Sequence, residues 1–371
     1  MKSNYTQYSH QPLLLSNNRV WRTYFGGKKI EEWQGLSDPK DGELPEEWIA
    51  STIKARNTGR EHLVNEGLSK VVLEEGTEIF LKELIESNPE AFLGTAHVEK
   101  YGCNTGVLVK ILDSSSRLSI QVHPDVDFAQ KFFNSKFGKT EAWYVLGGRT
   151  INGEPPFLLF GFKPGITKQK WHDLFMKQDI QGMMDSLHRI PLESGSIFLI
   201  EGGLPHAIGS GCLLVEIQEP TDYTIRVERT TPEGKTIPDA MCHQGIGFEK
   251  IFDCFHYEGL SLQETLNRWR ISPVSLERNP DYQVTRLIGP ENTKKFSLHR
   301  ILIRKTMQFR NNDGIFSILI VTSGSGKIIY HDRVLNIHQA SLLFLPAELT
   351  EFSIESYPGP QLELIHCLPP D

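Results

Sequence analysis

Hydrophobic and polar residues alternate along 118–123, and this pattern predicts a β-strand with one polar face. Its apolar residues alternate with Ser119, Gln121 and His123, so the side chains of Gln121 and His123 point to the same side. Pro124 and Asp125 then end the strand. An amide oxygen and a neutral imidazole are donors that a divalent first-row metal accepts. The stretch therefore predicts half of a metal site.

A carboxylate follows where the chain turns back. Phenylalanines at helical spacing predict a short helix within 126–137, and Gly138 starts the return into a second strand over 142–146. If the two strands are neighbours, Glu141 lies beside Gln121 and His123. A single histidine on a strand is more often only hydrogen-bonded or exposed, so the metal interpretation depends on a further ligand downstream.

That ligand is His206, in the segment GSIFLIEGGLPHAIGSG at 195–211. An apolar strand is followed by a glycine-rich turn and then by the histidine. The spacing from Gly195 through Gly203 to His206 matches the second motif of the cupin barrels, with Glu201 where that motif usually has proline. The segment around His123 resembles the first cupin motif, lengthened by the helical insertion.

Four separated blocks together resemble the type I mannose-6-phosphate isomerases: LSIQVHPD (118–125), GKTEAWYVL (138–146), PHAIGSG (205–211) and EIQEPTDYTIR (216–226). The segments RVWRTYFGGKKIEEWQG (19–35) and LPEEWIASTI (44–53) look like the amino-terminal part of that family, so the match spans roughly the first two thirds of the chain. The resemblance implies an enzyme that interconverts mannose 6-phosphate and fructose 6-phosphate. It also implies one Zn²⁺ per chain, with other divalent first-row metals as alternatives, bound by four ligands: Gln121, His123, Glu141 and His206.

Moving a proton between adjacent sugar carbons through an enediolate requires a base, an electrophile and groups that hold the sugar. By resemblance, Arg226 is the active-site arginine, and it would stabilise the enediolate or grip phosphate. Glu216 matches a pocket carboxylate, for positioning or proton transfer. Lys139 projects to the same side as Glu141 on a strand, and would bind phosphate or move a proton. The identity of the base stays open.

The whole chain predicts a mainly β fold of two cupin-like β-barrels, or jelly rolls, with inserted and flanking helices. We expect a metal-binding domain at 1–290 and a smaller cupin-like domain at 291–371 that lacks metal ligands. Helical insertions are expected at about 76–95, 126–137 and 167–188. Residues 213–217 and 223–227 are predicted to pair as a hairpin, and 261–269 to form a helix.

Composition narrows the class of protein. The net charge is −7 and no basic run occurs, which argues against a nucleic-acid partner. No apolar stretch is long enough for a signal peptide or a membrane span, so we expect a cytosolic protein that does not bind membranes. The five cysteines are scattered without a Cys-x-x-Cys pair, which predicts reduced, mostly buried thiols. Monomer and homo-oligomer remain equally open.

Two alternatives belong to other functional classes. One is a metal cupin that acts on another sugar or by another reaction, and the other is a non-catalytic sugar-binding cupin. Glu201 departs from the cupin motif, and 242–290 has no clear counterpart in the compact bacterial form of the family. The joint presence of Lys139, Glu216 and Arg226 favours an enzyme over a binding protein, because a pure binder has no need for all three.

Overall fold

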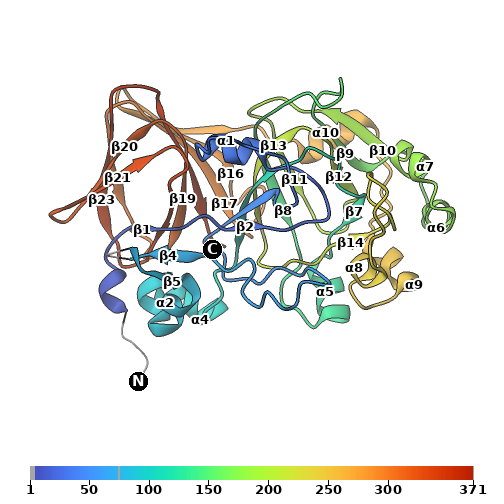
Figure 1. The fold of residues 1–371 in the computed structure, drawn as a ribbon, viewed down its shortest axis with the longest axis horizontal. Coiled ribbons are helices and arrows are strands. Elements are labelled where there is room, and N and C mark those ends of the chain that lie inside the picture. The colour runs from blue at the N-terminus through green and yellow to red at the C-terminus, as the bar shows by residue number, and fades with distance from the viewer. Residues whose placement is uncertain (1–4, 74–75, 371) are drawn as a thin grey trace.

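Two β-barrels lie side by side in the computed structural model, which describes residues 5–73 and 76–370 (Figure 1). The mainly β fold is as predicted. In Figure 1 the C-terminal barrel, drawn in orange and red, stands beside the first barrel, and most helices lie at the outer ends and lower side of the pair. Across these described ranges, no helix combines the length and the apolar character needed to span a membrane.

The first barrel consists of two facing antiparallel sheets. The five-stranded sheet has the order β10 (Leu187–Pro191), β9 (Phe157–Phe162), β12 (His206–Ile208), β7 (Gln121–Val122) and β14 (Ile225–Arg226). The six-stranded sheet has the order β11 (Ile197–Ile200), β8 (Glu141–Gly148), β13 (Cys212–Gln218), β6 (Leu108–Asp113), β3 (Glu46–Ile49) and β2 (Arg19–Val20). Large apolar side chains fill much of the space between the sheets, and the metal-ligand candidates point into the remainder.

The C-terminal barrel also has two sheets. The seven-stranded sheet has the order β1 (Leu13–Leu14), β22 (Leu342–Leu345), β19 (Ser317–Ser323), β24 (Leu362–Leu368), β17 (Ser297–Ile303), β16 (Tyr282–Ile288) and β15 (Val274–Arg278). The four-stranded sheet has the order β18 (Thr306–Arg310), β23 (Glu351–Ser356), β20 (Ser325–Tyr330) and β21 (Arg333–His338). A separate pair, β4 (Lys70–Val72) and β5 (Glu78–Phe80), lies beside β1.

The C-terminal barrel begins earlier than the predicted boundary between residues 290 and 291. Strands β16 and β17 lie on either side of that boundary and pair along their length, and β15 extends the same sheet. One apolar cluster includes Tyr144 and Ile197 of the first barrel and Leu298 and Phe344 of the second. The two barrels therefore share a buried core.

Helices surround the barrels: α1 (Lys28–Trp33), α2 (Leu81–Ser87), α3 (Pro89–Leu93), α4 (Thr95–Tyr101), α5 (Val126–Phe133), α6 (Lys168–Lys177), α7 (Ile180–Asp185), α8 (Asp239–His243), α9 (Phe248–Ile251) and α10 (Leu262–Trp269), with the 3-10 turns η1 (Thr6–Tyr8) and η3 (Phe252–Cys254). The predicted insertions at 126–137 and 167–188 contain α5 and the pair α6–α7. The insertion at 76–95 is not one helix, because the backbone breaks at Asn88, where the following Pro89 disfavours helical geometry.

The predicted hairpin of 213–217 with 223–227 is wrong. Strand β13 pairs with β6 and β8 in the six-stranded sheet, whereas β14 pairs with β7 in the other sheet. The connection at 219–224 therefore crosses from one sheet to the other instead of forming a tight turn. The helix predicted at 261–269 is present as α10, and a Ser261–Glu264 capping box starts it.

Candidate metal centre and active site

Side chains from both sheets of the first barrel converge on one point. Strands β12 and β7 place His206 directly opposite Gln121, and His123 follows β7 on the same face. Glu141 begins β8 in the other sheet, so it reaches the histidines across the barrel interior and not from a neighbouring strand. Within the described residues, His123, Glu141 and His206 form the one group of three whose metal-binding atoms all lie within 4.8 Å.

Backbone carbonyls fix the orientation of both imidazoles. The Nδ1 atom of His123 lies 2.9 Å from the carbonyl oxygen of Tyr223, and Nδ1 of His206 lies 2.9 Å from that of Leu204. An Nδ1–H donated to each carbonyl leaves the Nε2 lone pair free, which is how metal-binding histidines are usually held. These Nε2 atoms lie 3.3 Å (His123) and 3.6 Å (His206) from the oxygens of Glu141.

The donor set fits a zinc-like ion. Two ligands at about 2.0–2.1 Å from one tetrahedral ion are about 3.3 Å apart, close to the separations observed. Both oxygens of Glu141 are buried, and their near neighbours are the Lys139 ammonium and the two imidazoles, a setting that suits a carboxylate that binds a cation. The Gln121 amide nitrogen lies 3.3 Å from Nε2 of His206, and rotating the amide by half a turn presents its oxygen instead.

Charges around this group keep it in the protonation state that metal binding requires. Burial and the neighbouring ammonium of Lys139 lower the pKa of His123 to about 3, and burial also lowers that of His206. Burial raises the pKa of Glu141, but the charge of Lys139 and the interactions with His123 and His206 together outweigh it, so the pKa lies well below its ordinary value. Two neutral imidazoles and an ionised carboxylate result.

Lys139 adjoins the metal-ligand candidates. Its Nζ atom lies 3.0 Å from Glu141 Oε2 and 2.9 Å from His123 Nε2. A divalent cation held by these donors would repel the ammonium toward the adjoining cavity, which Lys139 also lines.

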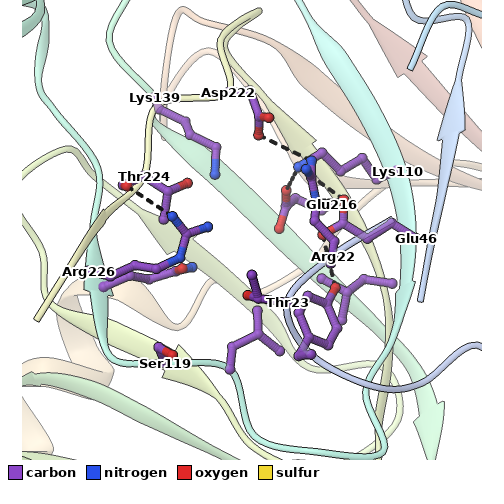
Figure 2. A pocket seen from close by; sticks show the side chains of 14 residues that line it. Arg22, Thr23, Glu46, Lys110, Ser119, Lys139, Glu216, Asp222, Thr224 and Arg226 are labelled. Carbon is purple, nitrogen blue, oxygen red and sulfur yellow. Dashed lines mark hydrogen bonds and ion pairs between the residues drawn. The ribbon is translucent and has the colours of Figure 1, made fainter. Parts of the chain in front are cut away.

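This cavity, of about 40 Å³, brings together all three residues predicted to be catalytic (Figure 2). Figure 2 shows Lys139 and Arg226 on one side and Glu216 on the other. The Arg226 guanidinium donates to two backbone carbonyls, at 3.3 Å (Thr224) and 2.8 Å (Met241). No described carboxylate forms an ion pair with it, and it keeps its charge at neutral pH even though burial lowers its pKa.

Glu216 is held rigidly. Its oxygens accept hydrogen bonds from Lys110 Nζ at 2.9 Å and from Trp143 Nε1 at 3.1 Å. Burial raises the pKa of Glu216, and the nearby negative charge of Glu141 raises it further. Both oxygens have fixed donors, so the carboxylate is better placed to orient its neighbours than to move.

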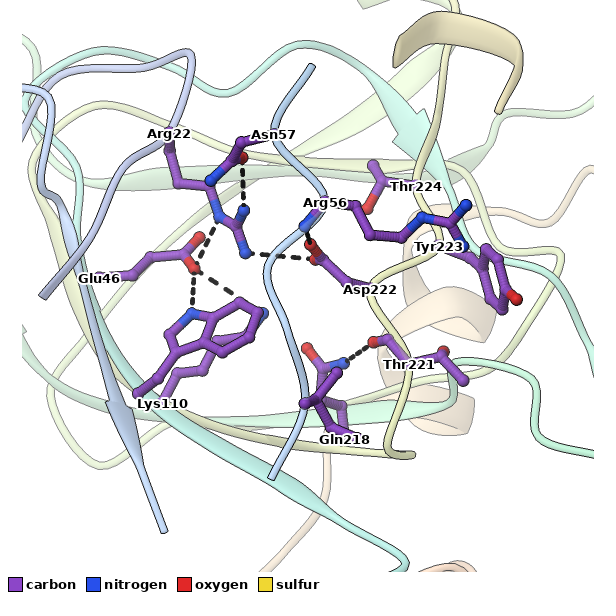
Figure 3. Close-up of polar contacts among 12 residues, drawn as sticks. Arg22, Glu46, Arg56, Asn57, Lys110, Gln218, Thr221, Asp222, Tyr223 and Thr224 are labelled. Atoms are coloured by element: carbon purple, nitrogen blue, oxygen red, sulfur yellow. Dashed lines mark hydrogen bonds and ion pairs between the residues drawn. The ribbon is translucent and has the colours of Figure 1, made fainter. Parts of the chain in front are cut away.

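Sequence reasoning assigned no role to a buried ionic network beside the cavity (Figure 3). Arg22 donates to Glu46 at 2.9 Å, to Asn57 at 3.0 Å and to Asp222 at 3.2 Å. Lys110 lies between the two glutamates, 2.9 Å from Glu216 and 3.9 Å from Glu46. The sequence does contain a sign of this network. Lys110 interrupts the apolar run VLVKIL, where an unpaired charge would be costly, so a buried partner for Lys110 is expected.

Glu201, the departure from the cupin motif, lies away from the metal-ligand candidates. Its side chain is 49% exposed, and Oε2 accepts a hydrogen bond from Trp269 of α10 at 2.9 Å. The departure from proline could have put an extra carboxylate near the metal or merely altered a turn, and the group of metal-ligand candidates among the described residues does not include Glu201.

Comparisons with known proteins agree with this geometry. The family model "Phosphomannose isomerase type I, catalytic domain" matches residues 17–139. A probable mannose-6-phosphate isomerase, GmuF of Bacillus subtilis, is 27% identical over 266 residues, which is 70% of this chain and 76% of the relative. The mannose-6-phosphate isomerase of Streptococcus mutans is 33% identical over 223 residues, 58% of this chain and 60% of the relative.

The chain resembles the type I phosphomannose isomerases. Solved structures share its fold over nearly the whole length. The mannose 6-phosphate isomerase of Bacillus subtilis superimposes with a TM-score of 0.74 at 23% identity, covering 96% of this chain and 99% of that one. A zinc-bound mannose 6-phosphate isomerase gives a TM-score of 0.71 at 16% identity, with 97% and 100% covered.

The type I phosphomannose isomerase family model ends at Lys139. It includes Gln121 and His123, whereas Glu141, His206, Glu216 and Arg226 lie beyond it. The structure of this chain places Glu216 and Arg226 on the cavity, and Glu141 and His206 beside His123.

Proposed function

We propose that this chain is a metal-dependent aldose–ketose isomerase that interconverts mannose 6-phosphate and fructose 6-phosphate by proton transfer through an enediol(ate). The observation that carries the proposal is the convergence of two kinds of side chain in the first barrel. Donors suited to a divalent ion meet there, and Lys139, Glu216 and Arg226 line the adjoining cavity. Similarity to the type I phosphomannose isomerases supports the same reaction.

The metal, proposed to be zinc, would be held by Gln121, His123, Glu141 and His206. When bound, it supplies a positive charge that polarises sugar oxygens. Two imidazoles, one carboxylate and one amide oxygen suit zinc, and other divalent first-row ions also fit such a set.

We assign to Arg226 the role of stabilising the developing oxyanion or of binding the phosphate group. Its guanidinium lines the cavity and forms its recorded hydrogen bonds with backbone carbonyls, so its charge is available to an anion. A neutral ground-state carbonyl gains less from this charge than an enediolate does, which is the condition for lowering the barrier.

We assign to Lys139 the transfer of the proton between the two sugar carbons. Its nitrogen lies between the metal-ligand candidates and the cavity, where a substrate carbon next to a polarised oxygen would be placed. Glu216 is assigned a positioning role, because both its oxygens are already hydrogen-bonded to Lys110 and Trp143.

The volume of the cavity is smaller than that of a hexose phosphate. At about 40 Å³ it holds little more than a water molecule or two, so substrate binding must displace lining side chains. Lys139 is one candidate for this movement, because a cation held by the metal-ligand candidates would repel its ammonium toward the cavity.

The experiment is to measure conversion between mannose 6-phosphate and fructose 6-phosphate by purified protein, before chelation, after chelation and after zinc is restored. The metal is quantified on the same samples. We expect activity to disappear with the metal and to return with it. A protein that holds stoichiometric metal and does not interconvert this pair would disprove the substrate assignment.

A further inference from the structure

A second cavity, of about 180 Å³, lies within the C-terminal barrel, apart from the residues of the proposed active site. Its lining combines polar and aromatic side chains, principally His299, Phe309, Asp313, Ser317, Phe352 and His366. The barrel has no assigned role in the proposed isomerisation, so this lining requires a separate explanation.

The strand pattern places three of the polar residues on the inside of the barrel. His299 precedes the core residue Ile301 by two positions on β17, and Ser317 precedes the core residue Leu319 by two positions on β19. His366 follows the core residue Leu364 by two positions on β24 and is directly paired with His299. Polar groups thus occupy interior positions where the continuing pattern would place apolar side chains.

These polar side chains lack hydrogen-bond and ion-pair partners in the part of the chain that the structure describes. Among residues 5–73 and 76–370, no hydrogen bond or ion pair is formed by the side chains of His299, Asp313, Ser317 or His366. The Nε2 atom of His366 is in addition fully buried. Buried polar groups are nearly always satisfied, so the unpaired hydroxyl of Ser317 and the buried Nε2 atom of His366 indicate that something outside the protein binds them. The half-buried His299 and the exposed Asp313 lie on the same cavity.

The lining argues against a metal ion and against an anion. The rings of His299 and His366 are 6.1 Å apart, compared with 4.8 Å for His123 and His206 at the metal-ligand candidates. Burial lowers the pKa of His299 to about 4 and of His366 to about 3, so neither carries positive charge at neutral pH. Asp313 adds a negative charge, and Arg310, the lining cation, faces Glu351 at 3.5 Å.

The four-stranded sheet supplies an apolar wall opposite the polar residues. Its Phe309 and Phe352 are stacked with their ring centroids 4.7 Å apart. Leu345, which is paired with Ser317 on the seven-stranded sheet, and Leu349 also line the cavity. A ligand that matches both walls is uncharged, has one apolar face, and carries groups that both donate and accept hydrogen bonds. An apolar cavity of about 150 Å³ holds a six-membered ring, so this one accommodates a single substituted ring.

We propose that the C-terminal barrel binds one neutral polyhydroxylated ring of monosaccharide size. Its hydroxyl groups would meet His299, Ser317, His366 and Asp313, and its C–H face would lie against the phenylalanine wall. The site is separate from the proposed isomerase centre, and the proposal does not depend on the reaction assigned to that centre.

The test uses the full-length protein and follows the imidazole resonances of its histidines by NMR while D-mannose or D-glucose is added. The resonances of His299 and His366 should shift and saturate. Those of His331 and His338, which are exposed on the same barrel, should not move and serve as internal controls. Sugar binding at the isomerase centre would move His123 or His206 instead, so the two sites are distinguished.

Two variants make the test decisive. His366→Phe fills the cavity and should abolish the shift of His299. Ser317→Ala removes one hydroxyl at nearly constant size and should weaken binding on the order of fivefold while the folded spectrum is retained. The proposal is overturned if neither sugar shifts the two resonances, if the shift survives in His366→Phe, or if only Zn²⁺ or inorganic phosphate produces it.

Discussion

The guanidinium of Arg22 lies 3.2 Å from the carboxylate of Asp222, although 200 positions separate the two residues in the chain. Asp222 also accepts a hydrogen bond from the backbone N–H of Arg56 at 2.8 Å. The contact therefore joins the amino-terminal segment and the 54–58 segment to the connection that precedes Arg226. Both side chains are less than 10% exposed, so solvent screens the pair little.

Replacing Arg22 with methionine should lower the free energy of unfolding by about 3–5 kcal/mol, because it leaves the carboxylates of Glu46 and Asp222 buried with fewer partners. Urea unfolding followed by circular dichroism measures the change. The matched control is Arg229→Met, which removes an exposed ion pair with Asp239 at 2.9 Å and should cost at most about 1 kcal/mol. Equal losses in the two variants would contradict a structural role for the buried network.

Glu47 should make the protein less stable as the pH rises. Burial raises its pKa from 4.5 to about 7, so the unfolded chain gives up this proton near pH 4.5 while the folded protein keeps it until about pH 7. The folded state then binds more protons across that window, and stability falls with increasing pH and is constant above it. The shift of about 2.5 units corresponds to about 3 kcal/mol.

Glu47→Gln removes this titration, so its stability relative to the natural protein should improve by about 3 kcal/mol between about pH 4 and about pH 8. The preceding residue, Glu46, has its pKa shifted in the opposite direction. Burial raises its pKa, but Arg22 and Lys110 outweigh that effect and lower it to about 2. Its contribution is present above pH 4.5 and is lost as the pH falls toward 2. A stability difference between Glu47→Gln and the natural protein that does not vary with pH would refute the assignment for Glu47.

Glu201→Gln should leave metal content and isomerase activity within twofold of the natural protein, because its carboxylate bonds to Trp269 on α10 and not to the metal-ligand candidates. Metal analysis and a steady-state assay on the same preparation measure both properties. Glu141→Gln is the matched change at a proposed ligand and should lose metal. Loss of metal in Glu201→Gln would show that the residue does take part in the site.

The sequence was sufficient to bring Gln121, His123, Glu141 and His206 together, since two cupin-like motifs specify them. The condition considered for Glu141, that its strand neighbours that of Gln121 and His123, is not met, because Glu141 faces the histidines from the opposite sheet. A hydrophobic pattern shows which face of a strand is buried, but it does not show which strands pair.

The same limit explains two further differences. The connection between Glu216 and Arg226 was interpreted as a hairpin, although it crosses between sheets. The contacts of Arg22 with Glu46 and Asp222 depend on three segments that no local pattern relates to one another. The break at Asn88–Pro89, by contrast, was visible in the sequence as a proline inside a helical pattern.

The most direct test of the central claim is to measure bound metal and conversion of mannose 6-phosphate on the same samples of three proteins: the natural chain, Glu141→Ala and Arg226→Ala. The natural chain should hold about one equivalent of metal and be active, Glu141→Ala should lose both, and Arg226→Ala should keep its metal and lose most of its activity, by about 100-fold or more. Full metal and activity in Glu141→Ala, or unchanged turnover in Arg226→Ala, would contradict the account.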